Sequence, residues 1–333
     1  MEENLITIVV PLYNGEKYIT KCLDSVFNQT YKKIEILIID DGSTDSSYIK
    51  AAEFIKNRSA DVFNARLLKQ ENKGVARARN RGIEEANGEF IAFIDQDDYI
   101  DKNYIQVLLN NMQHQKSDIV VSGYYRIDTK EKKLRTVALQ EQEWAKFLNL
   151  APWGKLYRLS YLKNSGIRFL DVKKGEDCYF NVLAYAYTPK VVTLPYVGYY
   201  WVDQQYSVTN RIHKQVHEDT DVCILFNCIL RDLNKENYIS EDLLEYYFIK
   251  AIVYDILFSA KQSGYISARN LTSELFLWLK NHFPEWSRNR NISFFLPRGE
   301  QFFTKVAVAV FCKLYMYRLT NVFLRVYCRG SKI

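Results

Sequence analysis

The sequence contains no pair of cysteines spaced as metal ligands. Its six cysteines are scattered over 333 residues, with no CxxC among them, which argues against a cysteine-based metal site. The N-terminus has no basic segment followed by an apolar stretch and a small-residue cleavage site, so no signal peptide is predicted. We therefore expect reduced core cysteines in a cytoplasmic protein.

Acidic residues are missing from the end of the chain. No Asp or Glu follows Glu300, whereas six Lys and Arg residues do, and this excess accounts for the formal net charge of +6. A nucleic-acid-binding protein more often spreads basic residues over its main domain. We therefore expect no nucleic-acid partner, and a basic tail that suits an anionic membrane surface.

The most apolar helical pattern, Phe302–Tyr327, is interrupted by four basic residues. Burying them near the bilayer centre would cost up to about 10–14 kcal/mol, against roughly 4–7 kcal/mol returned by the apolar side chains. A membrane-spanning helix is therefore not predicted. On a helical wheel Arg318, Arg325 and Arg329 share one side, which predicts an amphipathic helix over 302–329 lying on an anionic membrane. The alternative is a helix packed on the protein, with its arginines in solvent.

Short apolar runs alternate with helical patterns in the first half of the chain. The predicted strands are Leu5–Leu12, Ile34–Asp40, Ala65–Gln70 and Phe90–Asp95. Between them, apolar residues recur at helical spacing from Ile19 to Phe27, and helices are predicted over Ser46–Arg58 and Val75–Asn87. This order predicts an α/β fold with a mostly parallel sheet and helices on both faces.

The pattern changes in the second half of the chain. Two further strands are predicted, at Ser117–Ile127 and Val191–Val202. The later part is mainly helical, with helices predicted over Val216–Leu233, Glu241–Lys261, Ala268–Lys280 and Phe302–Tyr327. We place a boundary near residue 210, which divides the chain into a catalytic domain (1–210) and a C-terminal helical domain (211–333).

Polar residues follow three of the predicted strands. They are Tyr13-Asn14, Asp40-Asp41 and the run from Asp95 to Asp98. Ligands of open α/β sheets bind beyond the carboxyl ends of the strands, so a ligand site is expected there. Asp95 and Asp97, two residues apart, are suited to one hard cation such as Mg²⁺ or Mn²⁺. The alternative is an acidic turn that caps the next helix.

Five ordered segments resemble the family 2 glycosyltransferases of the GT-A fold. They are VVPLYNGEKYI (9–19) with IIDDGSTD (38–45), NKGVARARNRG (72–82), EFIAFIDQDD (89–98), WGKLY (153–157) and GED (175–177). The resemblance extends to about residue 210. It implies a Rossmann-like GT-A domain, a DxD metal motif and inverting transfer of a sugar from a nucleotide diphosphate-sugar.

The resemblance also implies which residues bind the donor. They are Pro11, Tyr13, Asn14, Asp40, Asn72, Gly74, Arg79, Asp95 and Gln96. Asp40 would accept a hydrogen bond from the imide N–H of uracil, although an ordinary β-turn also explains it. Arg79 is the arginine of its helix expected to face the site. Gln96 stands where the family often has a small residue, and we expect this to matter little.

The same resemblance implies a separate role for each of the acidic residues. Asp95 and Asp97 are the metal-and-ribose carboxylates, with Asp97 coordinating directly, and Asp98 would face the donor sugar. Asp177 matches the catalytic base, because an acceptor hydroxyl needs a carboxylate to take its proton. The alternatives are Glu176 as the base, or an acidic pair favoured by a helix N-terminus.

Three further matches are weaker. Lys155 would contact diphosphate or acceptor, or be a surface lysine. His213 lies where some relatives supply a third metal ligand, although a structural histidine is the commoner case. The segment Ser207–Thr209 resembles one that closes over diphosphate.

The expected reaction is transfer of a hexose or N-acetylhexosamine from a UDP-sugar to a glycan or lipid-linked glycan, as in capsular polysaccharide synthesis at the inner face of the cell membrane. The main alternative is a non-catalytic nucleotide-sugar-binding scaffold, which would have no need of a base. A dehydrogenase would show GxGxxG after the first strand, and a nucleotidyltransferase a Gly- and Lys-rich first loop. Neither pattern is present.

Overall fold

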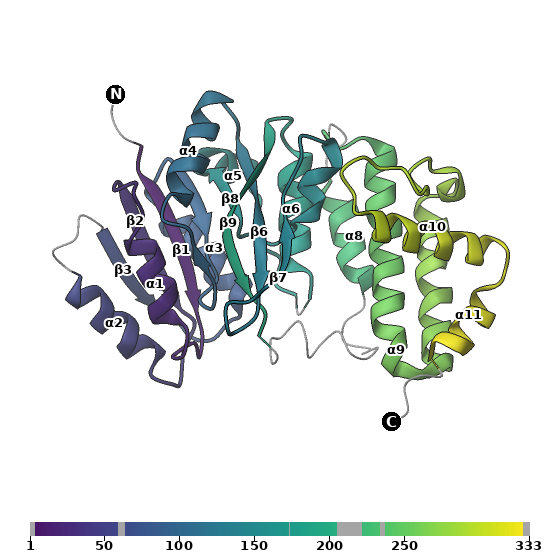
Figure 1. The fold of residues 1–333 in the computed structure, drawn as a ribbon, viewed down its shortest axis with the longest axis horizontal. Helices are drawn as coiled ribbons and strands as arrows, with labels where there is room; N and C mark the ends of the chain where they lie inside the picture. Colours follow the sequence, from purple (N-terminus) through teal and green to yellow (C-terminus); the bar gives the residue numbers. More distant parts are fainter. Residues whose placement is uncertain (1–3, 59–63, 173, 205–221, 234–236, 329–333) are drawn as a thin grey trace. The chain divides into compact units, whose positions relative to one another are not determined.

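The computed structural model describes residues 4–58, 64–172, 174–204, 222–233 and 237–328 (Figure 1). The chain forms two compact units, Met1–Asp203 and Gln204–Ile333. Each unit has its own architecture and is described by itself. The boundary expected near residue 210 lies outside the described residues.

Four parallel strands form the first half of the sheet in the N-terminal unit. They are β1 (Ile6–Leu12), β2 (Ile34–Asp40), β3 (Asn64–Lys69) and β4 (Phe90–Phe93). β1 lies between β2 and β4, and β3 pairs with the outer side of β2. Every residue of β1 and β2 is buried, as expected for β-branched runs covered on both faces. The predicted α/β class and these four strands are confirmed.

The second half of the sheet mixes strand directions. It contains β5 (Tyr99–Ile100), β6 (Ile119–Ile127), β7 (Lys133–Val137), β8 (Lys155–Arg158) and β9 (Val191–Val202). The strand order is β3-β2-β1-β4-β8-β6-β9-β5, with β7 paired to β6. β4 and β6 both pair antiparallel with β8, so they run in the same direction, and β9 is parallel to β6. The carboxyl ends of β1, β2, β4, β6 and β9 therefore share one edge.

Helices cover both faces of this sheet (Figure 1). They are α1 (Ile19–Phe27), α2 (Ser47–Asn57), α3 (Val75–Glu85), α4 (Tyr104–His114), α5 (Leu159–Ser165) and α6 (Glu176–Ala186), with a 3-10 turn at Glu143–Leu148. α3 lies directly on β1 at Gly82, because a Cβ there would overlap the side chain of Val9. Glycine thus sets the distance between this helix and the sheet.

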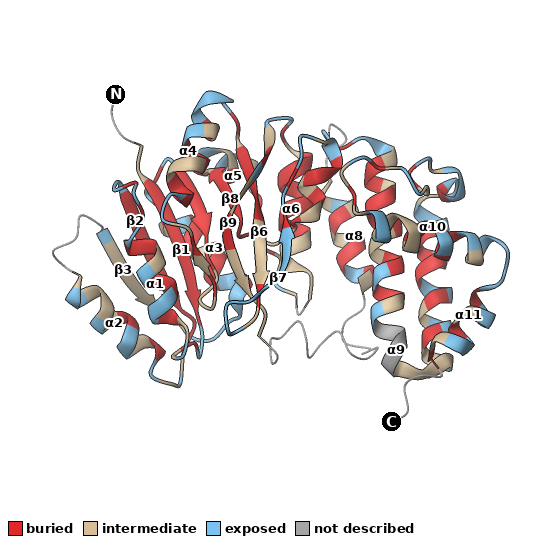
Figure 2. Cartoon of the chain, viewed as in Figure 1, coloured by how far each residue is buried: buried red, intermediate tan, exposed pale blue. Residues whose placement is uncertain are grey.

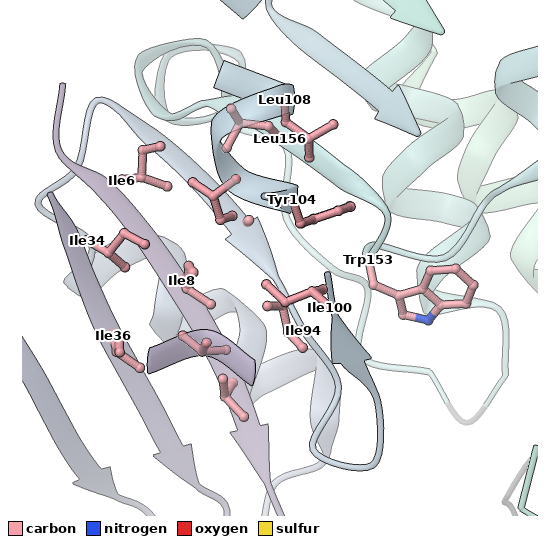
Figure 3. Close-up of a cluster of buried hydrophobic side chains, with 14 of the residues drawn as sticks. Ile6, Ile8, Ile34, Ile36, Ile94, Ile100, Tyr104, Leu108, Trp153 and Leu156 are labelled. Carbon is pink, nitrogen blue, oxygen red and sulfur yellow. The ribbon is translucent and has the colours of Figure 1, made fainter. Parts of the chain in front are cut away.

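The main apolar core lies on one face of the sheet, under α1 and α4 (Figures 2 and 3). Ile6 and Ile8 of β1 and Ile36 of β2 are wholly buried in it. Tyr104 of α4 and Trp153, which precedes β8, are buried members of the same cluster.

The C-terminal unit is helical, with α8 (Val222–Asp232), α9 (Glu241–His282), a 3-10 turn (Trp286–Arg288), α10 (Phe302–Met316) and α11 (Thr320–Tyr327). Two helices were predicted within α9. The structure has one long element that is kinked at Gly264, whose φ of 76° is one that glycine adopts readily. The predicted gap is thus reduced to a single residue.

The prediction of a single helix over Phe302–Tyr327 is wrong, because the structure has two helices there. Arg318 adopts a left-handed conformation with φ of 60°, and the N–H of Leu319 donates to the carbonyl of Leu314 at 2.7 Å. This closes α10, and α11 starts afresh at Thr320. The helical wheel that joined Arg318 to Arg325 therefore does not apply, and Arg329 lies outside the described residues. Within the described chain no helix is long and apolar enough to cross a membrane.

Candidate active site

The acidic run after β4 turns back toward β9. Asp98 is only 2% exposed, and its carboxylate accepts the hydroxyl of Tyr199 at 2.7 Å and the N–H of Val202 at 2.8 Å. Burial raises the pKa of Asp98 well above its ordinary value, and the nearby Asp97 and Asp95 raise it further. Asp98 thus anchors β9, which differs from the expectation that it faces the donor sugar. The reason is the short strand β5, which directs the chain after Asp98 back against β9.

Asp95 and Asp97 form a carboxylate pair at the same turn. Burial, followed by the charge of Asp95, raises the pKa of Asp97 to about 6. Two crowded carboxylates of this kind suit a divalent cation, which would relieve their repulsion. Among the described residues no three His, Cys, Asp or Glu side chains gather as a ready-made metal site. Two carboxylates still fit Mg²⁺ or Mn²⁺ when phosphate oxygens complete the coordination.

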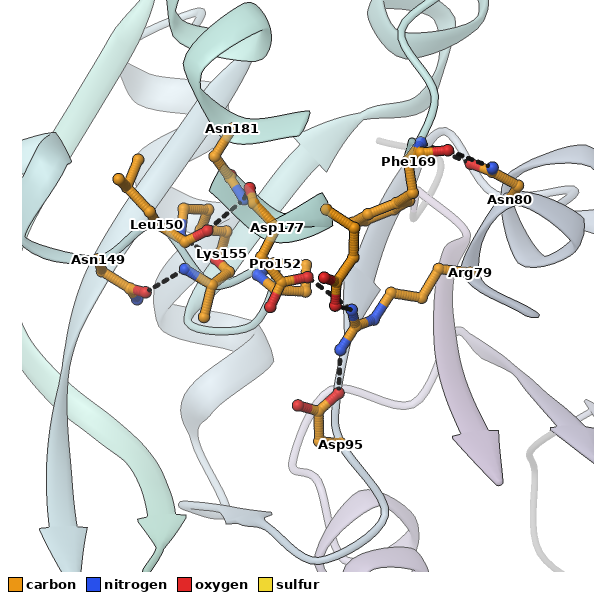
Figure 4. A network of polar contacts seen from close by, with 12 residues as sticks. Arg79, Asn80, Asp95, Asn149, Leu150, Pro152, Lys155, Phe169, Asp177 and Asn181 are labelled. Atoms are coloured by element: carbon orange, nitrogen blue, oxygen red, sulfur yellow. Dashed lines mark hydrogen bonds and ion pairs between the residues drawn. The ribbon is translucent and has the colours of Figure 1, made fainter. Parts of the chain in front are cut away.

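Arg79 connects this turn to α6. Its side chain is 4% exposed, and it donates to Oδ1 of Asp95 at 2.8 Å and to Oδ1 of Asp177 at 2.6 Å (Figure 4). Glu176 lies 3.8 Å away, and the ring of Phe169 packs against the guanidinium. Three carboxylates therefore surround one buried cation. The two other arginines of α3 make different contacts. Arg77 pairs with Asp171, and Arg81 donates to the carbonyl of Lys69.

Asp177 lies in the first turn of α6, after Gly175. Burial raises its pKa to about 7, although the charge of Arg79 opposes this shift. Its side chain is 29% exposed, and its Oδ1 accepts from Arg79. A carboxylate that titrates near neutral pH is suited to take a proton from a hydroxyl.

Lys155 is neither a surface lysine nor a ligand for diphosphate. It is wholly buried, and its Nζ donates to the carbonyls of Ala151 at 2.5 Å and Trp153 at 3.4 Å. Burial lowers the pKa of Lys155 well below its ordinary value. The lysine instead holds the loop before β8, which Asn181 of α6 also fixes by donating to the carbonyl of Leu150 at 2.8 Å (Figure 4).

The loops beyond β2 and β3 are joined by Asp41. Its carboxylate accepts from the side chain of Gln70 at 2.7 Å and from the N–H groups of Lys73 at 2.9 Å and Gly74 at 2.8 Å. This fixes the loop that contains Asn72. Asp40 beside it is wholly buried; Oδ1 accepts from Ser43 at 3.4 Å, and Oδ2 has no partner among the described residues. The role of Asp41 in holding this loop was not predicted.

The end of β1 is tied to the acidic run through Gln96. Its amide accepts from the N–H of Tyr13 at 2.8 Å and donates to the carbonyl of Tyr13 at 2.9 Å. The ring of Tyr13 is 44% exposed, and Pro11 lies buried within β1. Asn14 accepts from the N–H of Thr44 at 2.9 Å. The remaining candidates, Ser207–Thr209 and His213, lie outside the described residues.

Most of the residues expected to form the site thus meet at one edge of the sheet. The family model for glycosyl transferase family 2 matches residues 7–173, which is half of the chain and includes most of β1, the acidic run and Arg79. The chain belongs to this family.

Named relatives agree with this assignment. The glycosyltransferase GlyA of Streptococcus pneumoniae is 35% identical over 211 residues, covering 58% of this chain and 30% of GlyA. GlyG of the same organism is 42% identical over 125 residues, covering 37% of this chain and 40% of GlyG. The matches thus span less than half of either relative.

Solved structures support the GT-A fold. Staphylococcus aureus TarS (1-349) in complex with UDP aligns with a TM-score of 0.54 at 21% identity, covering 90% of this chain and 96% of that structure. Its complex with UDP-GlcNAc aligns with a TM-score of 0.55 over 97% of this chain and 88% of that structure. At this identity the likeness concerns the fold.

Proposed function

We propose that this protein transfers a sugar from a UDP-sugar to an acceptor hydroxyl, with inversion at the anomeric carbon. The observation that carries the proposal is the position of Arg79 between Asp95 and Asp177, at 2.8 and 2.6 Å. One buried guanidinium thereby sets the spacing between a carboxylate beside the metal motif and a carboxylate suited to be the base. A protein that only binds nucleotide sugars, as a scaffold would, needs no such base.

The reaction is a single displacement. Asp177, which the structure leaves partly open to solvent, takes the proton of the acceptor hydroxyl while the oxygen attacks the anomeric carbon. The bond from that carbon to the diphosphate oxygen breaks in the same step, and the electron pair leaves with UDP. Arg79 holds Asp177 in place, and its charge favours the ionised form that the base needs.

A divalent metal is part of the proposal. Asp95 and Asp97 would hold Mg²⁺ or Mn²⁺ at the turn after β4, since their crowded carboxylates match the oxygen ligands that these ions prefer. The bound ion would act as a Lewis acid that neutralises the departing diphosphate. Asp97 contributes more directly, because Asp95 already accepts a hydrogen bond from Arg79.

The nucleotide would lie over the loops that Asp41 and Gln96 hold together. The exposed ring of Tyr13 offers a surface for a base, with Pro11 and Asn14 beside it, and Asn72 with Gly74 lines the opposite loop. Asp40 has an unpaired buried oxygen that suits the uracil imide N–H. The binding of UDP and UDP-GlcNAc by TarS supports a uridine donor carrying a hexose or N-acetylhexosamine.

The decisive experiment measures donor hydrolysis and binding across a panel of UDP- and GDP-sugars, with Mn²⁺, with Mg²⁺ and with EDTA. We expect metal-dependent turnover of one UDP-sugar, which is lost in Asp97→Asn. The matched control is Asp24→Asn, because Asp24 is half exposed on α1 and its side chain pairs with Arg58. Wild-type protein that binds no nucleotide sugar, with or without metal, would instead favour the scaffold.

We further propose that the enzyme works on a glycan or lipid-linked glycan of a surface or capsular polysaccharide, at the inner face of the cell membrane. Large apolar side chains are exposed on α10 and α11, including Phe303 at 83%, Val322 at 63% and Val326 at 67%. Lys305, Lys313, Arg318 and Arg325 belong to the same segment, in which no acidic residue occurs. Apolar groups combined with positive charge suit an anionic bilayer surface.

Vesicle co-sedimentation tests this contact. The protein should bind phosphatidylglycerol vesicles at low salt, bind phosphatidylcholine vesicles weakly, and lose binding in the double variant Phe302→Ser/Phe303→Ser. Ile266→Ser is the control, because Ile266 on α9 is 73% exposed and outside the basic segment. Equal binding by both variants would show that α10 does not contact the membrane.

A further inference from the structure

Four aromatic side chains pack together near the carboxyl ends of β6 and β9. The indole of Trp153 stacks parallel to the ring of Tyr199, with the ring centroids 4.6 Å apart. Its centroid lies 6.1 Å from that of the Trp201 indole, and the planes of these two rings are inclined by 29°. Tyr124 packs edge-on against both indoles, at 5.0 and 6.3 Å. We name Trp153, Trp201 and Tyr124 the aromatic shelf.

The shelf is fixed to the acidic run of the site. Tyr199 donates its hydroxyl to Asp98, and the N–H of Val202 donates to the same carboxylate. Trp201 lies between these two anchored residues. The hydroxyl of Tyr199 also accepts from the N–H of Asp95 at 3.3 Å. The shelf is therefore held at a constant position relative to the metal motif.

The other end of the shelf is fixed to the helix of the base. The carbonyl of Trp153 accepts from Lys155 and from the side chain of Asn149. The same loop is bound to α6 through Asn181, which donates both to Leu150 and, at 3.0 Å, to the carbonyl of Asp177. Contacts thus run from the shelf to both groups of the proposed reaction.

Burial decreases along the stack. Tyr199 is wholly buried and Trp153 is 7% exposed, whereas Trp201 and Tyr124 are only partly buried. The apolar core therefore ends in an aromatic surface that meets solvent, and Trp201 is its outer member. None of the donor-binding residues proposed above belongs to this surface.

Charged groups lie directly beside the outer indole. The guanidinium of Arg126 is 5.0 Å from the ring of Trp201 and donates to Oδ2 of Asp203 at 3.1 and 2.6 Å. The side chains of Arg126 and Asp203 are 36% and 20% exposed. A guanidinium that can donate hydrogen bonds and a carboxylate that can accept them thus lie beside the partly exposed indole of Trp201.

A pyranose ring matches this arrangement. Its axial C–H groups form an apolar face that packs on an indole, and its equatorial hydroxyls point outward, where they reach hydrogen-bonding side chains. Ligand sites generally combine an apolar surface with a few placed polar groups. An acyclic polyol or a phosphate chain has no flat face to stack and gains little from an aromatic surface.

We propose that Trp201, supported by Trp153 and Tyr124, is the platform on which a pyranose ring of the acceptor glycan stacks, with Arg126 and Asp203 binding its hydroxyls. The assignment of that sugar as acceptor rests on the transfer reaction proposed above. The shelf adds the class of acceptor, a pyranose rather than an acyclic polyol, and names the residues that recognise it.

The same strand offers a matched control. Successive side chains of a strand point to opposite faces, so Tyr200 points away from the shelf. It stacks on Tyr99 at 4.6 Å and packs against Tyr125 at 5.1 Å. Removing the ring of Tyr200 disturbs β9 to a comparable degree and leaves the shelf intact.

The test is saturation-transfer NMR with methyl β-glucopyranoside and methyl β-N-acetylglucosaminide, with glycerol 3-phosphate as the acyclic comparator. We expect the pyranosides to bind the wild-type protein, with the strongest transfer to the protons of one ring face. Affinity should fall about tenfold in Trp201→Ala, as for one aromatic residue at a binding site. It should be largely kept in Trp201→Phe and unchanged in Tyr200→Ala.

The results distinguish failure of the shelf from failure of the proposed transfer reaction. The shelf is overturned if the wild-type protein binds no pyranoside, or if Trp201→Ala binds the pyranosides as tightly as the wild type does. It is also overturned if the pyranosides bind no more strongly than glycerol 3-phosphate. UDP binding, measured on the same samples by calorimetry, reports on the transfer reaction separately. Wild-type protein that binds UDP but no pyranoside overturns the shelf alone, whereas wild-type protein that binds pyranosides but no UDP-sugar overturns the proposed reaction alone.

Discussion

Nη1 of Arg79 lies 2.6 Å from Oδ1 of Asp177, although 98 residues separate them in the chain. The guanidinium comes from α3, which lies on the parallel part of the sheet, and the carboxylate begins α6. The contact therefore joins the nucleotide half of the N-terminal unit to the half that would receive the acceptor. It also places the proposed base, Asp177, beside a permanent positive charge.

The first prediction concerns the pH dependence of transfer. A base must be ionised to accept a proton, and burial raises the pKa of Asp177 to about 7. The rate should therefore rise with pH through about 7 and level off above it. Asp177→Asn should lower kcat by about 10²–10⁴-fold, the usual contribution of a general base. A rate that is flat from pH 5 to 9 in the wild type would exclude Asp177 as the base.

The second prediction concerns Arg79. Its charge opposes the rise of the Asp177 pKa, so Arg79→Leu should move the midpoint of the pH–rate profile to higher pH. Removing one partner of a buried charge cluster should also cost about 3–5 kcal/mol of unfolding free energy. If that variant does not fold, Arg79→Lys keeps the charge and should lower kcat with little movement of the midpoint. Arg77→Leu, at an exposed position, should change neither quantity.

The third prediction concerns Asp98. Its two oxygens accept from Tyr199 and Val202, and an asparagine can accept through only one atom. Asp98→Asn should therefore cost about 1–3 kcal/mol of unfolding free energy, measured by urea denaturation, because a buried donor is left unpaired. The KM for the acceptor should rise more than the KM for the donor, since the change loosens β9. An increase confined to the donor KM would place Asp98 against the donor sugar instead.

The fourth prediction concerns Gln96, whose amide makes two hydrogen bonds to the backbone of Tyr13. Gln96→Ala releases the end of β1 from the acidic run, so the KM for the donor should rise several-fold while kcat changes little. Stability should fall by less than about 1 kcal/mol, because these bonds are exposed to water. Gln113→Ala removes an exposed glutamine from α4 and serves as the control. A donor KM unaltered in Gln96→Ala would confirm that residue 96 is of little consequence.

Much of the fold was predictable because it depends on local pattern. Runs rich in β-branched and aromatic residues, such as Ile34–Asp40 and Val191–Val202, match their strands residue for residue. Strands as short as β5, with only Tyr99 and Ile100, carry no periodicity and were missed. The break at Arg318 was also missed, because a positive φ at a non-glycine residue has no signature in hydrophobic spacing.

The site residues, too, were predictable where they belong to a local motif and unpredictable where distant segments decide their surroundings. Asp95, Asp97 and Asp177 follow recognisable motifs, and the structure brings their elements together. The positions of Asp98 and Lys155 depend on where distant segments pass, so their burial was not predictable from neighbouring residues. Of the two adjacent aspartates the resemblance singles out Asp40, yet Asp41 is the residue that holds the loop at Lys73 and Gly74.

Gly82 touches none of the groups proposed to react, yet the site depends on it. Because it lets α3 lie against Val9 of β1, it sets the depth at which Arg79, three residues earlier on the same helix, reaches both carboxylates. A side chain as small as alanine would lift the helix and draw the guanidinium away from them. Selection for transfer should therefore act on a buried packing position as strongly as on the charged residues, and variation at residue 82 should be as restricted as at residue 79.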